Sequence, residues 1–188
     1  MSSSTVISDV TFTLEELLKN EQRPLNSFEV SLKSPAEEVI QPAMKPRVNL
    51  FLYRLVENTF GRNPERLALG PSAREYPPLW INVFFLLTPF AEDKLDEHRV
   101  FGEALRVLHD NSIVAGAALK GSLENTAEEL RVDLCPFTLE QLAQIWGALD
   151  KPYRLSVCYE VRTIFIDSLI VSPVSRALDV GTEFSQLP

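Results

Sequence analysis

Two long hydrophobic segments limit the folds that this chain can adopt. Residues 48–56 read VNLFLYRLV and residues 80–87 read WINVFFLL, so each segment carries apolar side chains on both faces if it is extended. A strand that is apolar on both faces lies centrally in a sheet, where helices or other subunits cover it. We therefore expect a sheet with these two strands at its centre and with Trp80 in a buried position.

Three further segments have the pattern of a β-strand. Residues 27–32 and 130–135 alternate apolar and polar side chains, as half-buried strands do. Residues 153–167 form the longest such segment, and its apolar side chains change face near Arg162 and Thr163. A change of face within one strand predicts a β-bulge at that point.

Three segments have the spacing of an amphipathic helix. Apolar residues recur at helical intervals from Ile7 to Leu18, and a second helix is expected from an Asp93 N-cap to about His109. Thr138 and Gln141 form a capping-box pattern before a third helix over residues 139–149. Three helices and about four to five strands predict an α+β fold with one mostly antiparallel or mixed sheet. We place this domain at residues 1–168 and a C-terminal tail at residues 169–188.

The charge of the chain argues against two classes of partner. The formal net charge is −8 and the sequence has no cluster of Lys and Arg, so nucleic acid and anionic membrane surfaces are poor partners. The longest apolar run, residues 83–87, is far too short to cross a bilayer, and the N-terminal residues do not have the pattern of a signal peptide. We expect a cytoplasmic protein with two reduced thiols.

The common catalytic and cofactor-binding motifs are absent from the sequence. It has seven glycines and no glycine-rich phosphate-binding loop, and Cys135 and Cys158 do not have the C-x-x-C spacing of a zinc or redox site. His98 and His109 would lie roughly 16 Å apart on one helix, too far to share a metal ion. We expect no enzyme activity, metal or cofactor. A Cys/His nucleophilic pair would require the fold to bring a cysteine to a histidine.

Four separated segments, in a fixed order, resemble a known family. They are VNLFLYRLVENTFGRN (48–63), PPLWINVFFLLTPFA (77–91), EHRVFGEALRVLHDN (97–111) and PYRLSVCYEVRTIFIDS (152–168). With these segments the chain is similar to the N-terminal domain of the cap, or tail-terminator, protein of phage-tail-like contractile injection systems. The resemblance covers about residues 5–170.

The resemblance implies a structural role in an assembled particle. In this family the cap is a hexameric ring on the last layer of the inner tube and the contractile sheath, so the implied partners are further copies of the chain, the tube protein and the sheath protein. The family supplies no catalytic residues. The alternatives are another assembly adaptor of the same particle, of the tube–baseplate type, or a small Cys-dependent hydrolase.

Two segments outside the central strands are candidates for partner contacts. The connection at residues 59–79 carries Arg62, Arg66 and Arg74, and Arg side chains are good donors in interfaces. The tail begins with the apolar residues Leu169, Ile170 and Val171, which could add to an exposed sheet edge. The alternative is that both segments are solvated and make no contacts.

Overall fold

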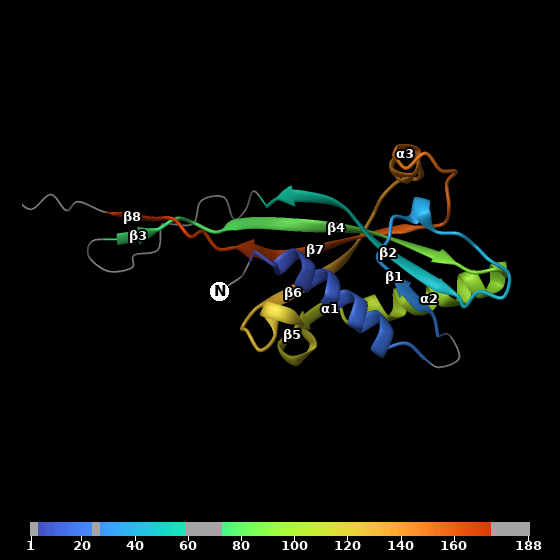
Figure 1. The fold of residues 1–188 in the computed structure, drawn as a ribbon, viewed down its shortest axis with the longest axis horizontal. Helices are drawn as coiled ribbons and strands as arrows, with labels where there is room; N and C mark the ends of the chain where they lie inside the picture. Colours follow the sequence, from blue (N-terminus) through green and yellow to red (C-terminus); the bar gives the residue numbers. More distant parts are fainter. Residues whose placement is uncertain (1–3, 24–26, 59–72, 174–188) are drawn as a thin grey trace, which may run out of the picture.

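The computed structural model describes residues 4–23, 27–58 and 73–173 (Figure 1). Within these residues, the α-helices are the three that the sequence predicts: α1 (Val6–Asn20), α2 (Lys94–Asp110) and α3 (Leu139–Ala148). Asp93 caps α2, because its carboxylate accepts hydrogen bonds from the backbone N–H groups of Leu95 and Asp96. Both hydrogen bonds of the Thr138–Gln141 capping box are present at α3.

In the part of the chain that the structure describes, six strands form one mixed sheet. The spatial order is β1-β2-β4-β7-β6-β5, and β1 is parallel to β2 while the other neighbours are antiparallel. The strands are β1 (Glu29–Ser31), β2 (Arg47–Glu57), β4 (Leu79–Phe90), β5 (Ile113–Ala115), β6 (Glu129–Cys135) and β7 (Val157–Ile166). The predicted α+β class and mixed sheet are confirmed. The predicted number of strands is too low, because the three-residue strand β5 is too short to show alternation.

The predicted β-bulge lies in β7. Ile81 of β4 pairs with Ile164, and Val83 pairs with Val161, so Arg162 and Thr163 together oppose Asn82. The extra residue lets Val161 and Ile164 face the same side of the sheet, where both are buried. The change of face in the sequence therefore marks a real irregularity and not the end of a strand.

Helices α1 and α2 cover one face of the sheet and form the main hydrophobic core with it (Figure 1). Alternate residues of β4 point into this core because side chains alternate across a strand. The core includes Val10, Leu14 and Leu18 of α1, Ala104, Val107 and Leu108 of α2, and Val83, Phe85 and Leu87 of β4.

Helix α3 lies on the opposite face and covers only one end of it (Figure 1). Leu142 and Trp146 of α3 pack there against Leu86 of β4 in a second, smaller cluster. Trp146 is 1% exposed, whereas Trp80 lies further along β4 and is half-buried, with its ring 5.0 Å from that of Phe165. The expectation of a buried Trp80 is therefore wrong, because an apolar strand does not show which part of each face is covered.

Candidate functional site

The two cysteines are not brought together with His109. Cys135 and Cys158 lie on the α3 side of the sheet, whereas His109 lines a hollow on the other side with Leu105 and Tyr159. The sheet separates these groups, so a Cys/His nucleophilic pair does not form with His109. Within the described residues, no group of three or more His, Cys, Asp and Glu side chains could hold a metal ion. No helix in this part of the chain is long and apolar enough to span a membrane.

Two buried carboxylates, Glu97 and Glu103 of α2, have structural partners. Glu97 accepts hydrogen bonds from Lys94 Nζ at 2.8 Å and Arg154 Nη2 at 2.9 Å, which links α2 to the segment before β7. Glu103 accepts from Arg106 Nη2 at 2.7 Å and from the backbone N–H of Arg23 at 2.8 Å. Buried charges that are paired and hydrogen-bonded in this way are fixed by their partners, and removal of one partner would leave an uncompensated buried charge. They are therefore poor candidates for acid–base catalysis.

The most unusual feature of the fold is a two-stranded extension that we call the β-arm (residues 73–79 and 166–173). It continues the β4–β7 pair beyond Leu79 and Ile166, where β3 (Ala73–Glu75) pairs with β8 (Val171–Pro173) in antiparallel register. The backbone N–H of Tyr76 donates to the carbonyl of Ile170 at 3.0 Å. Figure 1 shows the β-arm extending from the end of the sheet along the long axis of the molecule.

Two consecutive prolines explain why the β-arm is separate from the main sheet. Pro77 and Pro78 lie between β3 and β4, and proline has no N–H group to donate to a strand ladder. The regular pairing therefore stops at Leu79 and resumes at Glu75, which pairs with Val171. The β-arm projects away from the core as a result.

The β-arm exposes several large apolar side chains. Leu169 is 98% exposed, and Ile170, Val171, Tyr76 and Leu79 are also exposed. A two-stranded ribbon is marginally stable by itself, and apolar groups gathered on a projection are typical of an interaction surface. A hollow of about 480 Å³ lies at the base of the β-arm, lined by residues that include Glu57, Leu79, Trp80, Ile166 and Ile170. These features make the β-arm the best candidate for a contact with another protein.

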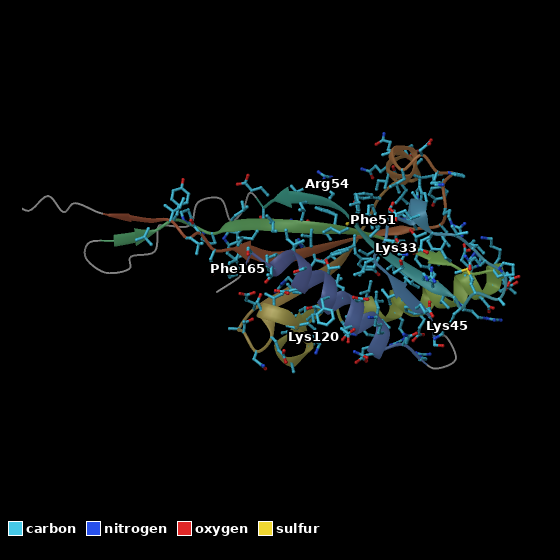
Figure 2. The ribbon with its side chains drawn as sticks, viewed as in Figure 1. Lys33, Lys45, Phe51, Arg54, Lys120 and Phe165 are labelled. Carbon is cyan, nitrogen blue, oxygen red and sulfur yellow. The ribbon has the colours of Figure 1, made fainter. Side chains whose placement is uncertain are left out.

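A second candidate surface is the part of the sheet that α3 leaves open, which we call the open face (Arg54, Trp80, Asn82, Phe84, Glu160 and Phe165). The guanidinium of Arg54 lies 5.3 Å from the centre of the Phe84 ring. Asn82 Nδ2 donates to Glu160 Oε1 at 2.7 Å. Figure 2 shows Arg54 and Phe165 on β2 and β7. Half-buried aromatic rings beside an Arg resemble the composition of protein interfaces.

The predicted contact residues fall partly within the β-arm. Arg74 lies in β3 opposite Ser172, and Leu169, Ile170 and Val171 lie in the other half of the β-arm. The structure thus brings together two segments that sequence reasoning treated separately. Arg62 and Arg66 lie outside the described residues. Sequence reasoning missed the pairing of β3 with β8 and the open face; the Pro77–Pro78 pair was the available signal for a break between β3 and β4.

Comparison with known proteins identifies a matching family and solved structures with a similar fold. The profile of the family described as "Pvc16 N-terminal domain" matches residues 9–177. The structure is similar to a PVC sheath/tube terminator of an extracellular contractile injection system in its extended state, with a TM-score of 0.69 and 18% sequence identity over 100% of this chain. It is also similar to the tube-terminating cap of the anti-feeding prophage, with a TM-score of 0.61 and 18% identity over 94% of the chain.

The matched structures are longer than this chain. The chain spans 66% of the PVC terminator and 61% of the anti-feeding prophage cap. At this level of identity the likeness establishes a shared fold. A search of curated protein sequences gave no match.

Proposed function

Because the chain belongs to the Pvc16 N-terminal domain family, we propose that it is a structural cap that terminates the inner tube and contractile sheath of a phage-tail-like contractile injection particle. The observation that carries this proposal is the similarity of the whole chain to the fold of a sheath/tube terminator. The role is structural and not catalytic, in keeping with the separation of the cysteines from His109 by the sheet.

The cap would act as a ring of identical subunits. A closed ring requires a heterologous contact, in which one surface of a subunit binds a different surface of its neighbour. The β-arm supports such a contact, since it projects from one end of the molecule and could reach an adjacent subunit (Figure 1). The hexameric number comes from the resemblance to the tail-terminator family.

The partners in this proposal are the tube protein, the sheath protein and further copies of the chain. We assign the contacts to the β-arm, through Leu169, Ile170, Val171 and Arg74, together with Arg62 and Arg66 of the preceding connection. Apolar side chains would supply buried area, and Arg side chains would donate to acidic groups of the neighbour. We also propose that the chain is synthesised and assembled in the cytoplasm as part of the particle.

Deletion of the chain from a particle-producing strain tests the proposal. A terminator adds contacts only at the final layer, so its loss leaves the tube and sheath proteins folded but removes the signal that ends their assembly. We expect tubes and sheaths of uncontrolled length, or fewer stable particles, measured by electron microscopy against a strain complemented with the wild-type chain. A wild-type length distribution together with a wild-type yield would refute the proposed function.

A further inference from the structure

The two cysteines of the chain lie opposite each other on neighbouring strands. Cys135 at the end of β6 pairs in register with Cys158 of β7, so both side chains point to the α3 side of the sheet. The Cα atoms of directly opposed residues on antiparallel strands are about 4.5–5.5 Å apart, within the range that a disulfide can bridge.

The surroundings make the two thiols unequal. Cys158 is 1% exposed, whereas Cys135 is half-buried and therefore the more accessible of the two. The interaction between the two neighbouring thiols lowers the pKa of Cys158 and raises the pKa of Cys135. The hydroxyl of Tyr53 lies 2.8 Å from Cys158 Sγ and also contributes to the lower pKa of Cys158. Thiol–disulfide exchange requires a thiolate, so the lower pKa of Cys158 favours its attack on a mixed disulfide formed at Cys135, whose accessibility makes it the first to meet the oxidant.

We propose that Cys135 and Cys158 are a redox-sensitive pair that closes into a cross-strand disulfide when it meets a small-molecule disulfide such as oxidised glutathione. The assignment goes beyond the structural role of the cap and does not depend on it. It uses two groups, already in register, that have no role in the proposed contacts.

The reaction takes place in two exchange steps. The accessible Cys135 sulfur loses its proton and attacks one sulfur of oxidised glutathione, and the displaced glutathione thiolate takes up a proton. The Cys158 sulfur then loses its proton and attacks the Cys135 sulfur of the mixed disulfide, which releases the second glutathione. Two protein thiols are oxidised to one disulfide, and one glutathione disulfide is reduced to two thiols.

The disulfide would fasten α3 to the sheet. The segment 135–158 contains the whole of α3, which is otherwise held by the small cluster of Leu86, Leu142 and Trp146. A cross-link that closes this loop stabilises the domain mainly by restricting the unfolded chain. We expect the melting temperature to rise by about 5–10 °C on oxidation.

The test uses the purified full-length chain in glutathione buffers of increasing oxidised fraction. We expect the intact mass to fall by two hydrogen atoms and a non-reducing peptide map to show one link, between Cys135 and Cys158. The higher melting temperature should return to its starting value when a reductant is added. The matched control is Cys135→Ser, which keeps the buried Cys158 and should show no shift in melting temperature on oxidation.

Several outcomes would overturn the assignment. They are two thiols that stay free in fully oxidising buffer, a reaction that stops at the mixed glutathione disulfide, a link between two chains, and a disulfide that fails to raise the melting temperature. If Cys135→Ser does not fold, as judged by circular dichroism, Cys135→Ala replaces it as the control. The mass and peptide map of the wild-type chain decide the question in either case.

Discussion

A single carboxylate joins α1 to the turn that follows β5. Asp9 accepts hydrogen bonds from Thr5 Oγ1 at 2.8 Å, from the backbone N–H of Ser122 at 3.2 Å and from Ser122 Oγ at 2.5 Å. Gly121 comes so close to this carboxylate that an added Cβ would lie 2.3 Å from Asp9 Oδ1. The turn also holds Gly121 at a φ of +66°, a conformation that disfavours other residues.

Gly121→Ala is therefore expected to destabilise the domain in two ways. The positive φ disfavours any Cβ, and the Cβ would also displace the Asp9 carboxylate from Ser122. We expect a loss of about 2–3 kcal/mol in the free energy of unfolding, measured by urea denaturation. The matched control is Gly116→Ala, where φ is +59° but nothing lies within 4 Å of the added Cβ, so the loss should be about 1 kcal/mol. Equal losses in the two variants would show that the contact with Asp9 contributes nothing.

The same carboxylate gives a pH-dependent contribution to stability. Burial opposes ionisation of Asp9, but the hydrogen bonds from Ser122 and Thr5 outweigh it and lower the pKa. A carboxyl whose pKa is lower in the folded state than in the unfolded chain stabilises the fold at pH values above its unfolded-state pKa. This stabilisation is lost as the pH falls through the folded-state pKa.

Asp9→Asn should melt below the wild type at neutral pH, because an amide replaces the charged acceptor of these hydrogen bonds. The difference in melting temperature should shrink as the pH is lowered from about 5 to about 2, where the wild-type carboxyl becomes protonated. Melting curves across this range check the prediction. A difference that stays constant or grows in acid would contradict it.

At the scale of elements, local signals in the sequence predicted the helices and failed for the short strands β3, β5 and β8. Asp93 and the Thr138–Gln141 pair mark helix starts through contacts within a few residues, so the sequence alone locates them. The pairing of β3 with β8 joins segments about a hundred residues apart, and neither strand lies in a segment with an alternating pattern of apolar and polar residues long enough to predict it. The sequence therefore indicated both halves of the candidate contact surface but not that they form one β-arm.

Helix α3 depends on Trp146, whose side chain fills the small cluster on the second face and donates through Nε1 to Ser156 Oγ at 3.0 Å. We expect Trp146→Ala to lower the free energy of unfolding by about 3–5 kcal/mol, as for a large buried aromatic residue. Trp80→Ala is the matched control; it removes a half-buried ring and should cost about 1–2 kcal/mol. Denaturant titrations of both variants test this difference. The prediction fails if Trp80→Ala lowers the free energy of unfolding by more than Trp146→Ala does.

The β-arm should affect assembly and not stability. Leu169→Asp combined with Ile170→Asp places charges on two exposed positions, so the melting temperature should change little. Particle yield should fall, since a charge buried in an apolar contact without a partner is costly. The matched control is Leu95→Asp, another exposed apolar residue, which lies at the start of α2. Particle counts by electron microscopy test the prediction. Normal assembly of the double variant would show that the β-arm is not part of the interface.

As a whole, the molecule is a core domain in which the two faces of the sheet are covered by helices to different extents. Two helices cover one face of the sheet, one helix covers only an end of the other, and the β-arm projects from one end (Figure 1). Helix spacing, caps and the β-bulge were predictable because they depend on neighbouring residues. The proposed role in assembly came from the resemblance of the four segments to tail terminators, since interface surfaces in the sequence look like ordinary exposed residues.

Imaging the intact particle with this chain labelled tests the proposed function most directly. An epitope tag at the N-terminus, detected with gold-conjugated antibody, would give the position of the chain along the particle. The terminator proposal predicts label at one end only, beyond the last layer of sheath and opposite the baseplate. Label at the baseplate, along the length of the sheath, or nowhere on assembled particles would contradict it.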